Sequence, residues 1–299
     1  MILMVFIDGL GIGEDNPEIN PLARDPELWP AGEHAPGYPG LRCQSLDANL
    51  GVEGLPQSAT GQTALLTGIN APAMIGKHLQ GFPSRQLIEI LETLSIFVKL
   101  KACGLSGTFA NAYRHPEDIH PASRLSVTSH ALKASGQPFR SLEHLRQKKA
   151  LYHDFSNRHL RDKGYEIPLF SAKQAARILI SIARHNDFTL YEHFLTDILA
   201  HRADVPAITH HLAELGRFVR ELLKDIKGQP LTLIITSDHG NIEDSRSRTH
   251  TRNPVPLLWS GADSREIDLL PVDIAGVTPW VLRMLGCLPK TSALKAFQT

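Results

Sequence analysis

The chain has 299 residues, 42% of them hydrophobic, which is enough to bury the core of one large domain or two ordinary ones. Lys and Arg together number 31, as do Asp and Glu, so no overall field attracts nucleic acid or a membrane surface, and we expect neither as a partner. Three cysteines fit neither a disulfide framework nor a Cys-based zinc site, which favours a reducing, cytoplasmic setting. The sequence does not predict the oligomeric state.

The first predicted element is a buried strand over residues 2–7, a continuous apolar run that ends at Asp8. The run has no basic flank and is too short for a signal peptide or a membrane span. Ligands of open α/β sheets bind at the carboxyl ends of the strands, so Asp8 lies where a site is expected. Residues 24–54 are rich in Pro, Gly and charge and predict a long surface excursion.

A helix is expected to begin at Ser58 and to end at Gly68. From the residues alone, two interpretations of Ser58 stay open. It can be a helix cap whose hydroxyl accepts a bond from an unpaired backbone N–H. It can also be a nucleophile, because the same N–H groups and the positive helix end bind phosphate. The neighbouring hydroxyls of Thr60 and Thr63 are interpreted as structural.

Helical and extended patterns then alternate along the chain, which predicts an α/β fold with a mostly parallel central sheet and helices on both faces. We expect helices over residues 85–104, 171–188, 206–228 and 273–286, and strands over 105–113, 231–238 and 254–261. Residues 189–197 are expected to be a strand that runs into a loop. Residues 113–170 are rich in His, Arg, Ser and Lys with weak periodicity. We interpret them as an inserted cap or lid on a core formed by residues 1–112 and 171–299.

Acidic and imidazole side chains gather after the predicted strands. Asp8 and Asp238 both follow apolar strands, and a parallel sheet brings neighbouring strand ends to one edge. His239 follows directly and His250 comes soon after, so the oxygen and nitrogen donors that divalent metals bind occur together. As the structural alternative, an Asp near Gly is often only a turn residue.

A second pair, Asp197 and His201, is four residues apart and would share one face if the segment were helical. Such a pair can hold one ion together, or it can be an ordinary surface pair of charges. The order of all these groups in one chain is more specific than any one of them.

In that order the sequence resembles the alkaline phosphatase superfamily, most closely the metalloenzyme branch that holds the cofactor-independent phosphoglycerate mutases and the phosphopentomutases. The resemblance covers residues 1 to about 112 and about 171 to 287, and leaves the expected cap unmatched. The segments that carry it are FIDGLGIG, SATGQ, TDILAH, TSDHGNIED and THTRNPVP.

The resemblance implies two divalent metal ions, most often zinc or manganese, with magnesium also possible. It assigns one ion to Asp8, Ser58, Asp238 and His239, and the other to Asp197, His201 and His250. Asn241 and Glu243 would orient these ligands. Substrate contacts are expected from Gly61, whose missing Cβ permits close approach or tight packing beneath the phosphate, and from Lys77, His78 and Arg114. His115, Arg124, Arg140 and Arg158 are further anion contacts or ordinary solvated charges.

The resulting hypothesis is phosphoryl transfer from a small phosphorylated metabolite, a phosphomonoester, through a phosphoserine at Ser58. The phosphoryl group would end on water, as in a phosphatase, or return to the substrate, as in a mutase. The expected cap is far shorter than in the cofactor-independent mutases, and Ala59 and Gln62 stand where those enzymes have Glu and His. Two alternatives remain: a phosphodiesterase, pyrophosphatase or sulfatase-like hydrolase on the same core, and a metal-binding protein without catalysis.

Overall fold

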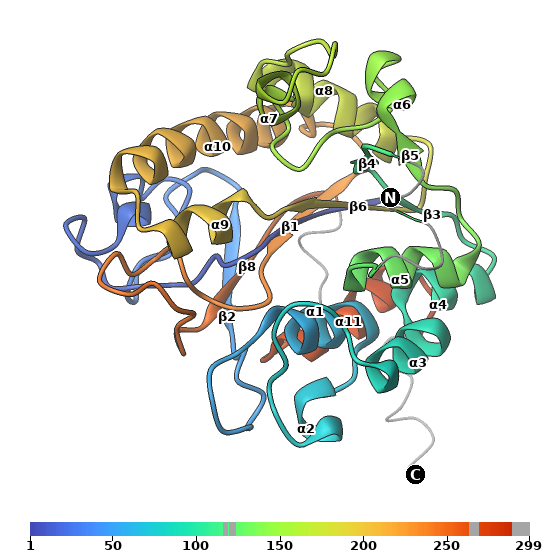
Figure 1. Cartoon of the computed structure of the whole chain (residues 1–299), viewed down its shortest axis with the longest axis horizontal. Helices are drawn as coiled ribbons and strands as arrows, with labels where there is room; N and C mark the ends of the chain where they lie inside the picture. The colour runs from blue at the N-terminus through green and yellow to red at the C-terminus, as the bar shows by residue number, and fades with distance from the viewer. Residues whose placement is uncertain (116–118, 120–123, 263–268, 289–299) are drawn as a thin grey trace.

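The structure, a computed structural model, describes residues 1–115, 119, 124–262 and 269–288. Its centre is a six-stranded sheet with the order β2-β8-β7-β1-β6-β3 (Figure 1). Strands β3, β6, β1 and β7 are parallel, whereas β8 is antiparallel to β7 and β2. The predicted α/β fold with a mostly parallel sheet is confirmed. The strands are β1 (Ile2–Ile7), β2 (Arg42–Leu46), β3 (Gly107–Phe109), β6 (Phe188–His193), β7 (Thr232–Thr236) and β8 (Val255–Gly261), with a separate pair β4 (Ala112–Tyr113) and β5 (Arg140–Ser141).

The apolar run of β1 follows from its position at the centre of the sheet. Its side chains alternate between two hydrophobic cores, so Leu3 and Val5 enter one core while Met4 and Phe6 enter the other. All four are at most 1% exposed. A strand covered on both faces needs apolar residues at every position, and this explains why the run does not alternate with polar residues.

Helices cover both faces of the sheet, as predicted (Figure 1). One layer holds α8, α9 and α10 with the short helices α6 and α7, and the other holds α1 to α5 and α11. Their bounds are α1 (Ser58–Thr67), α2 (Ala71–Ile75), α3 (Arg85–Leu94), α4 (Ile96–Ala102), α5 (Val127–Ser135), α6 (Leu142–Arg146), α7 (Arg158–Asp162), α8 (Ala172–Ala183), α9 (Leu195–Arg202), α10 (Val205–Asp225) and α11 (Val277–Met284), with 3₁₀ helices at Pro21–Arg24 and Ile274–Gly276.

The helix expected over residues 85–104 is in fact two helices, because Ser95 interrupts it. Ser95 has an extended backbone, with φ −61° and ψ 152°, and its side chain caps α4 by accepting from the N–H of Val98. Its hydroxyl also donates to the carbonyl of Ala131 in α5 at 3.1 Å. Local capping thus overrides a helical pattern that continues across the break.

The surface excursion expected over residues 24–54 also contributes to the interior, since it supplies the edge strand β2 and buries Trp29 at 2% exposure. Residues 113–170 contribute to both helix layers. Leu132 in α5 and Leu160 in α7 are fully buried in different cores. Residues 116–118 and 120–123 of this segment lie outside the described residues. The role of residues 113–170 as a cap stays a prediction.

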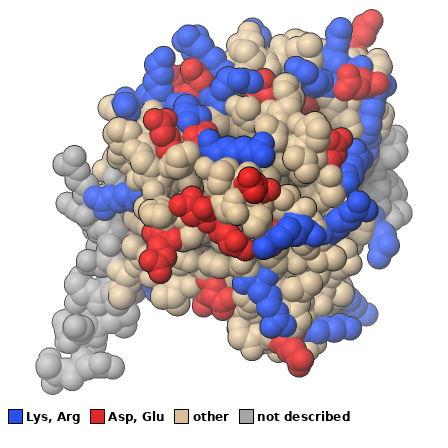
Figure 2. Space-filling model, turned by 90° about the vertical axis from the view of Figure 1, so that its left-hand side faces the viewer, with Lys and Arg blue, Asp and Glu red and all other residues tan. Residues whose placement is uncertain are grey.

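No helix in the described part of the chain is both long and apolar enough to cross a membrane. Acidic and basic side chains both occur on the face drawn in Figure 2. This mixture agrees with the balanced composition.

Candidate metal centre

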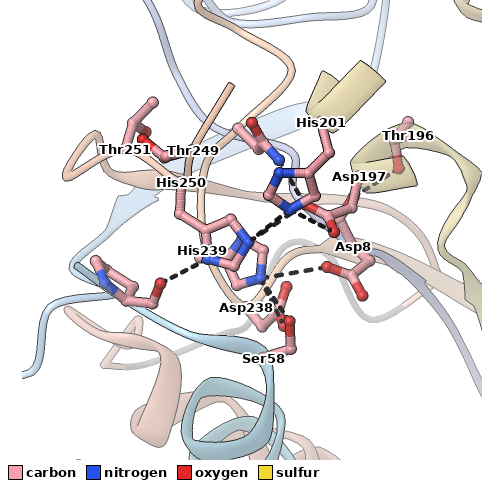
Figure 3. A network of polar contacts seen from close by, with 12 residues as sticks. Asp8, Ser58, Thr196, Asp197, His201, Asp238, His239, Thr249, His250 and Thr251 are labelled. Atoms are coloured by element: carbon pink, nitrogen blue, oxygen red, sulfur yellow. Dashed lines mark hydrogen bonds and ion pairs between the residues drawn. The ribbon is translucent and has the colours of Figure 1, made fainter. Parts of the chain in front are cut away.

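The seven predicted metal ligands lie together beside the carboxyl ends of three neighbouring strands (Figure 3). Asp8 directly follows β1, and Asp238 lies two residues beyond the end of β7. Ser58 is the first residue of α1, and α9 begins just after β6 and carries Asp197. The strand order places β6 and β7 on either side of β1, so these segments meet although they are far apart in the sequence.

One group of donors surrounds the Nε2 atom of His239. This nitrogen lies 3.0 Å from Ser58 Oγ, 3.3 Å from Asp8 Oδ1 and 3.4 Å from Asp238 Oδ2. Both acids and the imidazole are buried. Three buried residues with ligand atoms this close form a site that can hold a metal ion.

A second group lies next to the first and consists of Asp197, His201 and His250. The Nε2 atoms of the two histidines are 3.2 Å apart, and they lie 3.3 and 3.5 Å from the carboxylate oxygens of Asp197. Each histidine points this nitrogen inward because its Nδ1 contacts a backbone carbonyl, that of Arg248 or Pro56. Such outer contacts fix the orientation of metal-binding imidazoles.

The two groups form one continuous centre. The rings of His239 and His250 stack with their centroids 3.7 Å apart and their planes inclined by 17°. Asp197, His239 and His250 also have ligand atoms close enough to one another to hold an ion. The geometry therefore agrees with two adjacent metal positions, while the ligand roles themselves stay predictions.

The electrostatics of the centre favour the binding of cations. Burial raises the pKa of Asp8 and of Asp238 well above the usual value. Repulsion from Asp238 raises the pKa of Asp8 further, and repulsion from Asp197 raises both. Burial also lowers the pKa of His239 well below its usual value, so its imidazole is neutral. Asp8 Oδ1 and both oxygens of Asp238 are buried without a hydrogen-bonding partner. Divalent cations would satisfy these atoms, so the residues fit a metal centre.

Glu243 holds the loops of the centre together. Its carboxylate accepts hydrogen bonds from the backbone N–H groups of Gly11 and Asn241 and from the side chains of Thr251 and Asn253. The side-chain amide of Asn241 in turn donates to Asp197 Oδ1 at 2.6 Å. These contacts tie the loop after β1 to the loops on both sides of His250, which supports an orienting role for Asn241 and Glu243.

Ser58 is not a helix cap. The N-cap position of α1 belongs to Gln57, and Ser58 is the first helical residue, with its hydroxyl directed at His239. The hydroxyls of Thr60 and Thr63 instead donate to backbone carbonyls of the same segment, at 3.1 and 2.6 Å. The structural interpretation of these two threonines agrees with these contacts.

Gly61 permits the close packing of α1 against the Asp238 loop. A Cβ atom at this position would lie 2.8 Å from the carbonyl oxygen and 3.2 Å from the Cβ of Asp238. The close packing of α1 against this loop, beneath the centre, explains why the position needs glycine. The expected contact of Gly61 with substrate stays a prediction.

Replacing Gly61 with Ala is expected to lower the free energy of unfolding by roughly 1–3 kcal/mol, because α1 must move away from Asp238. Helix propensity alone would favour Ala by about 1 kcal/mol, so a stabilised variant would contradict the close contact. Urea denaturation measures the stability. Titration with manganese tests whether the displaced loop also weakens metal binding, by about tenfold.

The remaining candidate contacts are dispersed. Lys77 is exposed, and His78 has its Nε2 3.3 Å from the carbonyl of Val52. No described contact joins either one to the metal ligands. Arg140 donates to the carbonyls of Phe109 and Lys149, which agrees with a structural role. Arg114 lines a cavity beside the centre, and its role stays a prediction.

The contacts of two buried polar residues near the centre, Gln62 and Glu192, were not predicted from the sequence. The side-chain amide of Gln62 donates to Asp8 Oδ2 at 3.2 Å, and Glu192 in β6 accepts from the hydroxyl of Thr128 at 2.7 Å. Burial raises the pKa of Glu192 to about 7. An acid inside an otherwise buried strand was the available signal, because such residues are seldom buried without a function.

Replacing Glu192 with Gln is expected to flatten the pH dependence of stability in metal-free protein. The pKa of Glu192 rises from an ordinary 4.5 to about 7 on folding, so its contribution is complete below pH 4.5 and is lost as the pH rises through 7. Relative to the variant, the wild type should therefore lose roughly 3 kcal/mol between pH 4.5 and 8. Urea denaturation at several pH values measures this difference, and parallel curves would contradict it.

The sequence is similar to a metalloenzyme family model and to phosphoglycerate mutases. The sequence model of the Metalloenzyme superfamily matches residues 162–277. This range includes five of the seven candidate ligands, Asp197, His201, Asp238, His239 and His250, whereas Asp8 and Ser58 precede it. The 2,3-bisphosphoglycerate-independent phosphoglycerate mutase of Mycoplasmopsis synoviae is 28% identical over 127 residues, covering 40% of this chain and 25% of the mutase. The corresponding mutase of Prochlorococcus marinus is 30% identical over 112 residues, covering 33% of this chain and 21% of the mutase. The chain thus matches about a quarter of the length of these relatives.

Solved structures resemble the chain over nearly its whole length. An alkaline phosphatase from the Antarctic bacterium TAB5 has a TM-score of 0.55 at 12% identity, covering 96% of this chain and 98% of that one. An alkaline phosphatase of Thermus thermophilus has a TM-score of 0.56 at 13% identity, covering 97% and 92%. The PH0037 protein of Pyrococcus horikoshii has a TM-score of 0.57 at 13% identity, covering 97% of both. These likenesses establish an alkaline phosphatase-like fold.

Proposed function

Because the chain belongs to the metalloenzyme (alkaline phosphatase) superfamily, we propose that it transfers the phosphoryl group of a small phosphomonoester through a phosphoserine at Ser58. The observation that carries the proposal is the position of the Ser58 hydroxyl. It lies 3.0 Å from His239 Nε2, the same nitrogen that Asp8 and Asp238 approach. A serine with only a structural role would not need to share this cluster of donors.

Two divalent ions held by the seven candidate ligands would lower the pKa of the serine hydroxyl and neutralise charge on the phosphoryl and leaving oxygens. Ser58 Oγ then attacks phosphorus, the bond from phosphorus to the alcohol oxygen breaks, and the alcohol leaves with a proton. In the second half, water or the substrate's own hydroxyl attacks the phosphoserine and restores Ser58. The start of α1 suits this chemistry, because its unpaired N–H groups favour an anion.

Similarity to phosphoglycerate mutases and to alkaline phosphatases supports a phosphomonoester over a diester as the substrate. It does not choose between water and the substrate as the final acceptor. A diesterase or related hydrolase on the same core is the second candidate.

The first test is release of p-nitrophenol from p-nitrophenyl phosphate and from bis(p-nitrophenyl) phosphate by protein reconstituted with zinc, manganese or magnesium. We expect turnover of the monoester that requires the metal, and about two ions per chain by elemental analysis. EDTA should abolish this turnover. Preferential cleavage of the diester would favour the second candidate, and a folded, metal-loaded protein that cleaves neither ester would contradict both.

A further inference from the structure

A cavity of about 240 Å³ lies at the carboxyl ends of β3 and β6. Glu192 and Phe194 line it from the end of β6, Asn111 lines it from the segment after β3, and Thr128 lines it from the first turn of α5. The carboxyl edge is also where the metal centre lies, so this cavity and the candidate ligands share one edge of the sheet.

The cavity is one strand away from the metal centre. β6 is the direct neighbour of β1, and Glu192 pairs with Phe6, two residues before Asp8. Neighbouring strands are about 4.8 Å apart, and side chains two residues apart along a strand point to the same face. Glu192 is accordingly close enough to raise the pKa of Asp8 by repulsion. On the other side, Phe194 directly precedes α9, which carries Asp197.

Most polar groups in the cavity are already bonded to one another. The side chain of Asn111 exchanges two hydrogen bonds with the backbone of Glu192, at 2.7 and 2.9 Å, and Thr128 donates to the carboxylate of Glu192. The hydroxyls of Tyr113 and Ser129 are 2.6 Å apart. These contacts fix this part of the wall and leave the bonded groups little capacity for a ligand. Arg114 and Arg124 also line the cavity.

Five aromatic rings also line the cavity, those of Phe82, Phe109, Tyr113, Tyr152 and Phe194. Phe194 stacks on His153 at 4.1 Å, while Phe109 and Tyr113 are tilted with centroids 6.4 Å apart. Phe82 is 46% exposed, and the guanidinium of Arg124 lies 5.1 Å from the centroid of its ring. An exposed aromatic side chain beside a cavity is a typical contact for an apolar ligand group.

We propose that this cavity, which we call the aromatic pocket, binds the alcohol part of the phosphomonoester, and that this alcohol carries an aromatic ring. The inference rests on the proposed function, since it needs the phosphoryl group at the neighbouring metal centre. The ring would pack against Phe82, Tyr113 and Phe194, and Arg124 would cover it at the rim.

Binding of two phosphonates tests the pocket without requiring turnover. Benzylphosphonate and ethylphosphonate both carry a phosphorus group bonded to a CH₂, but only the first has a ring. Calorimetry with manganese-loaded protein should find benzylphosphonate bound at least about tenfold more tightly, because an aromatic ring is buried. In Phe82→Ala the preference should fall severalfold, whereas Phe82→Trp should keep it. Leu169→Ala, a change at a similarly exposed apolar residue outside the pocket, should leave the preference unchanged.

Equal affinity of the two phosphonates for the wild type would overturn the aromatic pocket, as would an undiminished preference in Phe82→Ala. Cleavage of p-nitrophenyl phosphate by the same preparation separates this result from the proposed function. Metal-dependent cleavage with equal phosphonate affinities would reject only the pocket. A preference for benzylphosphonate in protein that cleaves no ester would support the pocket and reject the phosphoryl transfer.

Discussion

Ser58→Ala is expected to reduce kcat/KM for p-nitrophenyl phosphate by a factor of about 1,000 or more. The Ser58 hydroxyl is the group beside His239, Asp8 and Asp238 that can form a bond to phosphorus. Ala removes one oxygen and leaves both acids and the imidazole in place, so the variant should still bind metal. Elemental analysis measures the metal content, and mass spectrometry of acid-quenched wild type should find phosphate on Ser58.

Thr63→Ala is the matched control, because it removes a hydroxyl from the same helix. The Thr63 hydroxyl donates a hydrogen bond to the carbonyl of Ala59, so this change should alter kcat/KM only slightly. Full activity in Ser58→Ala would show that the hydroxyl forms no covalent intermediate. Loss of metal together with activity would instead indicate that Ser58 acts mainly as a ligand.

Much of the fold could be predicted because its apolar patterns are strong. The run at residues 2–7 has the composition of a strand buried on both faces, and β1 has these bounds. The break at Ser95 could not be predicted, because the helical pattern continues through it. At the break, the Ser95 hydroxyl both caps α4 and donates to the carbonyl of Ala131, and the second contact is with a residue distant in the sequence.

The candidate ligands could be predicted because short motifs at strand ends and on one helix specify them. The parallel sheet brings Asp8 and Asp238 to one edge, and α9 places Asp197 and His201 on one face. For Glu192 the local sequence shows only an acid within an apolar strand, which does not place it beside Asp8. Its importance depends on the pairing of β6 with β1, and no local pattern records that pairing.

Asp238→Asn is expected to have opposite effects on activity and on the stability of metal-free protein. The Asp238 carboxylate is fully buried, and neither oxygen accepts a hydrogen bond. Burial and the charge of Asp197 raise its pKa. A raised acid pKa stabilises the fold at low pH, and this contribution is lost as the pH rises above the ordinary value of 3.8. At pH 8, metal-free Asn variant should therefore be more stable than metal-free wild type, by roughly 1–3 kcal/mol.

Metal should reverse this order, because a cation binds the carboxylate that otherwise destabilises the fold. With manganese present, the wild type should unfold at higher urea concentration than the variant, and the variant should lose activity by about a hundredfold or more. Asp244→Asn is the control, since Asp244 is paired with Arg246 in the same segment and should affect neither property strongly. If the wild type were the more stable protein both with and without metal, Asp238 would have a structural partner rather than a metal. Such a buried acid destabilises the metal-free protein and stabilises the metal-bound protein. Selection for metal binding, rather than for stability, would retain it.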